Sequence, residues 1–377
     1  MKTTTILLEE RIKMLENWLL ESGIQADEGG FYAWQDMNDK SHPYLYSEIT
    51  GYAITTLCFL YAMTENNTFI ERAKRAAKWI ENEAMDDSGG ILTRKYLKES
   101  VEHYSFGRGN IYSFDCAMAV FGMLKLYRIT KDARYLNLSE RVISFLNNKM
   151  LKTNGLYYPV FDTKKDAPIE EFDKWSMQSG SFHSKLALML CEFASLKKDA
   201  SYNTIAKRLI EASVDLFCKD GRFITNIKDH SSHLHPYSYT LEGMLCYSAM
   251  TQDDSYTDTA EKAFKKLTSF QSPDGGFTTE VSEDRKSDIA YQRSDIQAQI
   301  LRLSYFIGGK FDREKLLERL LSFQNITNDY KGGFLFGTDR DGSAKKHSNA
   351  WCSMFALQAL YLASGKVSRG IILDYFI

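Results

Sequence analysis

Hydrophobic and polar positions along the chain follow two kinds of helical pattern. One kind is amphipathic: in "FIERAKRAAKWIENEAM" (69–85), Phe69, Ala73, Ala76 and Ile80 fall on one helical face and charged residues fall on the other. The other kind is apolar nearly all round, as in "CAMAVFGMLKLYRI" (116–129) and "WCSMFALQALYLA" (351–363). A helix of the first kind has one face in water, whereas a helix of the second kind is covered on every side. The patterns therefore predict outer and inner helices.

The two kinds of helix alternate along the whole chain. The expected outer helices lie near 5–22, 67–85, 132–150, 199–217, 255–271 and 311–325. The expected inner helices lie near 48–64, 114–129, 177–196, 239–251, 294–306 and 349–363. Repeated hairpins of this kind close most simply into an all-α, (α/α)6 toroid, a single domain over residues 1–377 with the inner helices around its core. An open superhelix of hairpins is the alternative.

Each repeat carries two further marks, a glycine turn after the outer helix and a serine before the inner helix. The turns are "DEGGF", "DSGGI", "TNGLY", "KDGRF", "PDGGF" and "YKGGF", and the serines are Ser47, Ser113, Ser176, Ser238, Ser294 and Ser348. A serine side chain accepts hydrogen bonds from the first turn of a helix, so we expect these serines to be N-caps. The loops from turn to serine run to about 15–20 residues, whereas the other connections are short. The long loops should therefore lie together on one face.

Composition narrows the classes of function. The formal net charge of −2 and the pI near 6.4 provide no basic surface for nucleic acid. The N-terminal stretch lacks the apolar core of a signal peptide, and the apolar run 49–63 is shorter than the ~20 residues of a membrane span. We therefore expect a cytoplasmic protein with no nucleic-acid or membrane partner; the oligomeric state and the role of the apolar tail "GIILDYFI" (370–377) stay open.

Inner helices of a toroid converge at its mouth, so residues just after each serine should share one cavity. Carboxyl groups occupy four of these positions, at Glu48, Asp115, Glu242 and Asp295. A carboxylate near a helix N-terminus is also stabilised by the helix dipole, which gives a purely structural explanation for each one taken singly. A shared cavity favours chemistry, because glycoside hydrolysis needs two carboxyl groups, ~5 to 9.5 Å apart.

Aromatic and basic residues of the loops extend this set. The candidates for binding a substrate are Trp34, Tyr46, Arg108, Tyr112, Trp175, His183, His233, Tyr237, Arg293, His347 and Trp351. Aromatic rings offer an apolar face to the C–H side of a sugar, and arginine binds carboxylate or phosphate by paired hydrogen bonds. The spacing of His230, His233 and His235 is not that of a zinc site, so we expect no metal and no cofactor.

The alternation of outer and inner helices, the glycine turns and the acidic helix N-termini resemble the (α/α)6 toroids of the six-hairpin glycosidase kind. That superfamily also holds sugar epimerases and, with related toroids, polysaccharide lyases, so the resemblance implies a carbohydrate substrate. "HPYSYTLEG" (235–243) is similar to a segment of N-acylglucosamine 2-epimerase-type enzymes, although Glu242 comes later after the proline than in that motif. "FQSPDGGF" (270–277) resembles the repeat of triterpene cyclases, but their Asp-x-Asp-Asp acid motif is absent.

The leading expectation is a glycoside hydrolase in which Asp115 and Glu242 act as acid and base, with Glu48 and Asp295 as further candidates. Changing Asp115 or Glu242 to its amide should then abolish turnover and leave the fold intact. The alternatives are a polysaccharide lyase, in which Tyr239 or His235 removes a proton beside a uronate held by Arg293, and a sugar epimerase. A toroid that only binds glycans or protein is a further alternative, for which carboxyl groups should lie more than ~10 Å apart across the cavity.

Overall fold

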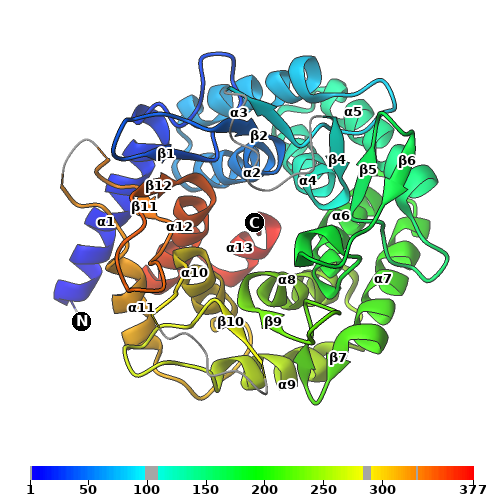
Figure 1. The fold of residues 1–377 in the computed structure, drawn as a ribbon. Coiled ribbons are helices and arrows are strands. Elements are labelled where there is room, and N and C mark those ends of the chain that lie inside the picture. Colours follow the sequence, from blue (N-terminus) through cyan, green and yellow to red (C-terminus); the bar gives the residue numbers. More distant parts are fainter. Residues whose placement is uncertain (1, 98–108, 283–289, 328–329) are drawn as a thin grey trace.

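The computed structural model describes residues 2–97, 109–282, 290–327 and 330–377, which form a double ring of helices (Figure 1). The outer helices are α1 (Lys2–Glu21), α3 (Asn67–Trp79), α5 (Ala133–Phe145), α7 (Ser201–Phe217), α9 (Thr257–Thr268) and α11 (Arg313–Leu321). The inner helices are α2 (Ser47–Thr64), α4 (Ser113–Thr130), α6 (Ala187–Lys197), α8 (Leu234–Thr251), α10 (Ser294–Leu303) and α12 (Ala350–Ser364). The π-helical turns η1 (Ile80–Ala84) and η2 (Leu146–Met150) extend α3 and α5, and the 3-10 helices η3 (Trp175–Met177) and η4 (Ser181–Leu186) precede α6.

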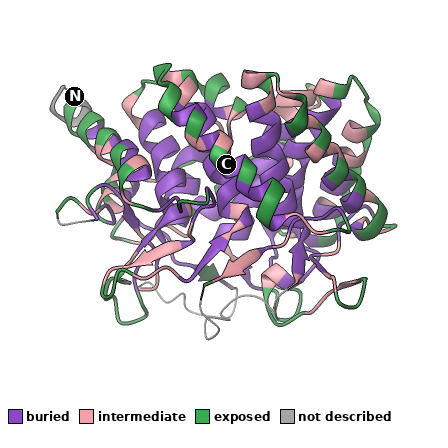
Figure 2. Ribbon diagram, turned by 90° about the horizontal axis from the view of Figure 1, so that it is seen from above, coloured by how far each residue is buried: buried purple, intermediate pink, exposed green. Residues whose placement is uncertain are grey.

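The inner helices close into a ring. Each contacts the next, from α2 through α4, α6, α8 and α10 to α12, and α12 contacts α2 again. The first outer helix, α1, also contacts α12, so the two ends of the chain of hairpins meet. Figure 2 shows the buried residues concentrated in the inner helices and the exposed residues on the outer ones. This closure confirms the predicted (α/α)6 toroid and excludes the open superhelix.

Two glycines bring α2 and α4 unusually close together. A Cβ atom on Gly51 would lie 2.5 Å from the backbone nitrogen of Ala119, and one on Gly122 would lie 2.6 Å from the carbonyl oxygen of Gly51. A larger residue at either position would push the helices apart. Because Glu48 and Asp115 lie one turn before this contact, the glycines also set how closely the two carboxyl groups approach.

Short strands connect the long loops on one face of the ring. They pair as β2 (Tyr44–Tyr46) with β3 (Arg94–Tyr96), β4 (Asn110–Tyr112) with β5 (Val160–Asp162) and β6 (Ala167–Ile169), β7 (Cys218–Lys219) with β8 (Arg222–Phe223), β9 (Ser232–His233) with β10 (Glu280–Val281), and β1 (Trp34–Asp36) with β12 (His347–Asn349) and β11 (Phe334–Leu335). The β1–β12 pair joins the first loop to the last. Segments of two or three residues are too short to show the alternation that predicts a strand.

The predicted role of the serines as N-caps is wrong. The residues that precede α2, α4 and α10 make no side-chain cap hydrogen bond, and Ser47, Ser113 and Ser294 are already the first helical residues. The hydroxyl groups of Ser47 and Ser294 instead donate to the carbonyl oxygens of Leu92 and Leu335, at 2.5 Å in each case. Because Leu92 and Leu335 follow glycine turns, these serines attach the inner helices to the loop face.

Two inner helices differ from the prediction at their starts. The helix expected near 239–251 begins at Leu234, because Pro236 lies in the first turn, where a missing N–H costs no hydrogen bond. The helix expected near 177–196 begins as the 3-10 helix η4 and becomes α-helical only at Ala187. Glu242 therefore lies deeper along α8 than its distance from Ser238 suggested.

The C-terminal tail packs inside the ring, at the end opposite the long loops. It forms α13 (Arg369–Asp374), which Figure 1 shows within the circle of inner helices. Phe376 and Ile377 are buried, and the Gln358 side chain of α12 donates to the carbonyl oxygen of Tyr375 at 2.6 Å. The tail thus closes one end of the toroid and leaves the loop face for a binding site.

Candidate active site

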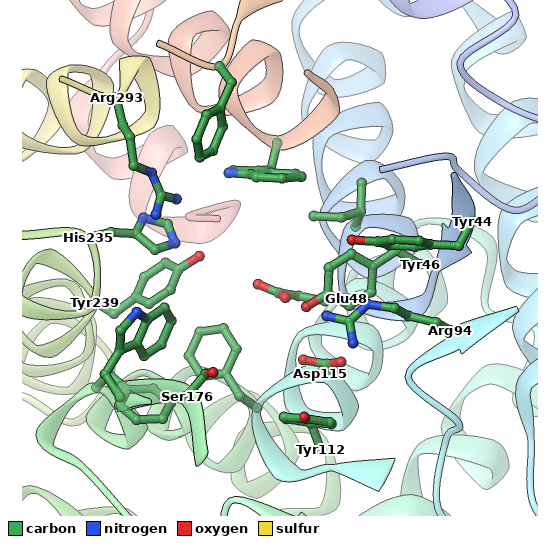
Figure 3. Close-up of a pocket in the computed structure, with 16 residues that line it drawn as sticks. Tyr44, Tyr46, Glu48, Arg94, Tyr112, Asp115, Ser176, His235, Tyr239 and Arg293 are labelled. Atoms are coloured by element: carbon green, nitrogen blue, oxygen red, sulfur yellow. The ribbon is translucent and has the colours of Figure 1, made fainter. Parts of the chain in front are cut away.

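A cavity lies where the N-terminal ends of the inner helices meet the long loops. Its space, including the part open to solvent, measures about 790 Å³. The residues that line it are Tyr44, Tyr46, Glu48, Ile49, Arg94, Tyr112, Phe114, Asp115, Trp175, Ser176, Phe182, His235, Tyr239, Arg293, Phe336 and Trp351. Figure 3 shows Glu48, Arg94 and Asp115 on one side of the cavity, and His235, Tyr239 and Arg293 on the other. We refer to these two groups as the acidic wall and the basic wall.

The acidic wall holds a pair of carboxyl groups. Glu48 of α2 and Asp115 of α4 both line this side of the cavity, and the negative charge of Glu48 acts on Asp115. Burial, reinforced by the charge of Glu48, raises the pKa of Asp115 well above its usual value, and burial also raises the pKa of Glu48. Two buried carboxyl groups on one wall resist ionising together, which favours a proton on one of them. The acidic wall can therefore donate a proton.

Arg94 of β3 limits the charge on this wall. Its guanidinium carbon lies 4.4 Å from the ring centroid of Tyr46 and 5.1 Å from that of Tyr44, within cation–π range of both rings. Its positive charge opposes the rise in the pKa of Asp115 and of Glu48. Arg94 therefore offsets the negative charge that these carboxyl groups carry.

The basic wall is organised around an ion pair. The Asp295 carboxylate accepts hydrogen bonds from both Nε and Nη2 of Arg293, the former at 3.1 Å, and from the Trp351 indole at 2.9 Å. Although burial alone would raise it, the pKa of Asp295 is lowered to about 2, chiefly by the charge of Arg293. Asp295 does not line the cavity itself. The prediction that its side chain faces the cavity is therefore not supported by the structure.

His235 is an uncharged imidazole on the basic wall. Burial, with help from the charge of Arg293, lowers its pKa to about 3, so the imidazole is uncharged at neutral pH. Its Nδ1 atom lies 2.7 Å from the Oε1 atom of Gln299, and its ring centroid lies 4.4 Å from that of Tyr239. The Tyr239 hydroxyl in turn accepts a hydrogen bond of 2.9 Å from Tyr52. An uncharged imidazole at a cavity wall can accept a proton.

Glu242 lies beneath the cavity and does not line it. Its carboxylate is fully buried between Lys185 of η4 and Arg302 of α10, at 2.7 Å from each. It is the ninth residue of α8, about two turns from the helix start, which places it in the core. The sequence-based placement of Glu242 at the cavity mouth is therefore corrected.

The remaining candidates divide between the cavity and its surroundings. Tyr46, Tyr112, Trp175, Arg293 and Trp351 line the cavity as expected. Trp34 and His347 lie beside it, with ring centroids 5.0 Å apart, and Trp34 is 6.4 Å from Trp351. Arg108 lies outside the described residues.

Three candidates do not line the cavity. His233 caps α8, and its Nε2 atom lies 3.4 Å from Nη1 of Arg293. Tyr237 is buried and donates to the carbonyl oxygen of Ala263 at 2.9 Å. His183 is fully buried, with its Nε2 atom 3.1 Å from the Ser113 hydroxyl. They support the fold around the cavity, and their predicted contact with a substrate is not supported by the structure.

Several residues in and around the cavity were not predicted from the sequence. Arg94 lies in a loop strand after the second glycine turn, so a search restricted to inner-helix N-termini misses it. Gln299 and Lys185 are polar residues within apolar helical runs, which is the one signal that could have marked them. In the described part of the chain, no group of three His, Cys, Asp or Glu side chains could hold a metal ion. No described helix is long and apolar enough to cross a membrane.

Known structures with this architecture were then compared with the chain. A cellobiose 2-epimerase from Bacillus thermoamylovorans is similar at 13% identity and a TM-score of 0.75, with 96% of this chain and 100% of the other covered. A D-mannose isomerase is similar at 12% identity and a TM-score of 0.72, with 95% and 98% covered. The chain has the (α/α)6 toroid fold. An unsaturated glucuronyl hydrolase specific for heparin shares this toroid at 15% identity and a TM-score of 0.67, with 96% and 98% covered.

The likeness rests on structure alone. No known family model matches the sequence, and no curated protein matches it in sequence. At these low identities the comparisons establish the toroid, which the helical pattern predicted, and the chemistry has to be argued from the cavity.

Proposed function

We propose that this protein is a sugar epimerase or isomerase, an enzyme that moves a proton at a carbon atom beside the carbonyl group of a reducing sugar. The observation that carries the proposal is the pairing of a neutral base, His235, with a proton-bearing carboxyl pair on the opposite side of one cavity. Groups whose pKa values are shifted in opposite senses are typical of acid and base roles in one site.

The chemistry follows from this placement. His235 removes the proton from C2 of an open-chain aldose; the electron pair of the broken C–H bond forms a C1–C2 double bond, and the carbonyl π pair moves to O1 to give an enediolate. Delivery of the proton of the Glu48–Asp115 pair to the opposite face of C2 inverts the configuration. Transfer of the O2 proton to O1, followed by delivery of the proton of the pair to C1, instead gives the ketose. Either route leaves the sugar at the same oxidation level, so the residues named need no redox partner.

The charges around the cavity favour a neutral sugar. Arg293 is balanced by Asp295, and Arg94 is balanced by the negative charge of the Glu48–Asp115 pair. Among the described residues that line the cavity, no positive charge is left over for a uronate or a phosphate. The rings of Trp175, Trp351 and Phe336 supply the apolar faces on which a pyranose packs.

Glycoside hydrolysis is the second candidate, and the Glu48–Asp115 pair is the observation that favours it. Hydrolysis needs a second carboxylate ~5 to 9.5 Å from the acid, across the scissile bond. Glu242 lies in the core and Asp295 is bound by Arg293 and Trp351, so neither is free for that role.

The other two alternatives fit the cavity less well. A lyase would need Arg293 to neutralise a uronate, but its guanidinium is already paired with Asp295. A toroid that only binds glycans was expected to keep carboxyl groups more than ~10 Å apart across the cavity. Glu48 and Asp115 lie on the same wall, and the raised pKa of each favours a catalytic role over binding alone. The similarity in fold to a cellobiose 2-epimerase and a D-mannose isomerase adds support for the first proposal.

Product analysis tests the proposal. The purified protein is incubated with mannose, with cellobiose and with a set of other reducing sugars, and the products are separated by chromatography. The proposal predicts a new epimer or ketose, with no rise in the number of reducing ends. Reducing ends released from a glycan would overturn it in favour of hydrolysis, and an unsaturated product that absorbs in the ultraviolet would overturn it in favour of a lyase.

A further inference from the structure

A chain of hydrogen bonds runs from the buried core to the imidazole of His235. Lys185 and Arg302 hold the Glu242 carboxylate at 2.7 Å each, and Gln299 Nε2 donates to Glu242 Oε1 at 3.3 Å. The other end of the same amide, Oε1, lies 2.7 Å from His235 Nδ1. Gln299 is fully buried on α10 and does not line the cavity.

The order of donors along this chain follows from the chemistry of Glu242. A carboxylate held between two cations is ionised and can only accept hydrogen bonds. Gln299 must therefore turn its NH₂ group toward Glu242 and its carbonyl oxygen toward His235. A carbonyl oxygen also only accepts, so Nδ1 of the neutral imidazole has to carry the proton. The lone pair is then left on Nε2, the nitrogen without a partner inside the core.

We propose that Gln299 is a positioning residue that fixes the tautomer of His235, and that Glu242 acts through it by fixing the orientation of the amide. This inference rests on the proposed function, because it matters for turnover only if His235 is the base. It also gives Glu242 a part in the site without contact with the sugar. A histidine held in the wrong tautomer has the right position but no lone pair facing the substrate.

Other groups facing the His235 ring do not replace Gln299. The Asp295 Oδ2 atom lies 3.4 Å from Nδ1, but it already accepts from Arg293 and from Trp351. Lys185 contributes positive charge and no acceptor, and His233 has its ring centroid 6.4 Å from that of His235. Loss of the Gln299 oxygen therefore leaves Nδ1 without a full partner, and the imidazole becomes free to carry its proton on Nε2.

The test is Gln299→Leu, which keeps most of the buried volume and removes the amide. The ring nitrogens of His235 are followed by NMR in protein labelled with [15N]histidine, without sugar, and the resonances are assigned by their absence in His235→Asn. We expect the wild type to hold the proton on Nδ1 and Gln299→Leu to move it largely to Nε2. We also expect kcat to fall at least ~10-fold with KM changed by less than ~2-fold, because Gln299 does not touch the sugar.

Gln297→Leu is the matched control. Gln297 is equally buried on the same helix, but its side chain bonds the backbone of Phe277 at 2.8 Å, away from His235. This control should keep both the tautomer and kcat of the wild type. An unchanged Nδ1–H tautomer in Gln299→Leu, or the same change of tautomer in both variants, would overturn the inference. If Gln299→Leu loses the Nδ1–H tautomer but the wild type turns over no reducing sugar, the positioning role is supported and the proposed function is rejected.

Discussion

Replacing Glu242 by glutamine should destabilise the fold, in contrast to the sequence-based expectation that it would stop turnover and leave the fold intact. The carboxylate is fully buried and lies 2.7 Å from both Lys185 and Arg302, whose side chains are also fully buried. The neutral amide cannot balance these two cations. Breaking a buried ion pair by removing one partner typically costs about 3–5 kcal/mol.

The surroundings of Glu242 indicate where in this range the loss of unfolding free energy should lie. Burial lowers the pKa of Lys185 to about 8, and the charge of Glu242 is the main influence that keeps it from falling further. At pH 7, loss of the proton from a lysine with such a pKa costs only ~1.4 kcal/mol, so Lys185 becomes neutral in the variant and removes part of the penalty. Arg302 keeps its charge. We therefore expect the free energy of unfolding to fall by about 3 kcal/mol, the lower end of the range.

Urea unfolding followed by circular dichroism measures this loss, with Asp115→Asn as the reference. Asp115 lies against another carboxyl group, so its amide should leave stability unchanged or slightly increased. If Glu242→Gln loses less than ~1 kcal/mol while Asp115→Asn loses more, the structural reasoning about both residues is wrong.

Three further predictions concern Asp115 of the carboxyl pair, the buried His183 and the contact between α2 and α4. Asp115→Asn should lower kcat by ~10²–10⁴-fold, the usual contribution of a general acid. Steady-state kinetics on a sugar that the wild type converts measures this loss, and a smaller effect would contradict the assignment of Asp115 as the acid. Burial lowers the pKa of His183 from 6.5 to about 3, so the unfolded chain binds a proton between these values while the folded chain does not. Its contribution to the free energy of unfolding should thus decrease by up to ~1.4 kcal/mol for each pH unit as the pH falls through this window, and His183→Gln should flatten the pH dependence measured in urea. Gly51→Ala should cost ~1–3 kcal/mol and also lower kcat, because it separates the helices that carry the carboxyl pair; unchanged urea stability would contradict the close approach.

The architecture was predictable because the pattern of apolar and polar residues in each helix indicates which of its faces are buried. The segment 351–363 is apolar all round and became an inner helix, whereas 69–85 has one charged face and became an outer one. The short strands and the start of α8 were not predictable in this way. Strands of two or three residues have no period, and the effect of Pro236 depends on which residue is first in the helix.

The candidate site was predictable only in part. The rule that residues after each serine face the cavity located Glu48 and Asp115, because α2 and α4 begin where it assumed. The rule failed for Glu242, since α8 begins five residues earlier than expected, at Leu234 instead of Tyr239. Gln299 was out of reach, because its proposed role depends on His235 and Glu242 of α8, which only the folded ring brings beside it.

The fate of the C2 hydrogen in heavy water tests the central claim most directly. A reducing sugar is incubated in D₂O with the wild type or with His235→Asn, and the C2–H signal is followed by NMR. The account predicts that the wild type replaces this hydrogen by deuterium as the product forms, and that His235→Asn leaves it in place. Product formed with full loss of the C2 hydrogen by His235→Asn at the wild-type rate would contradict the assignment of His235 as the base.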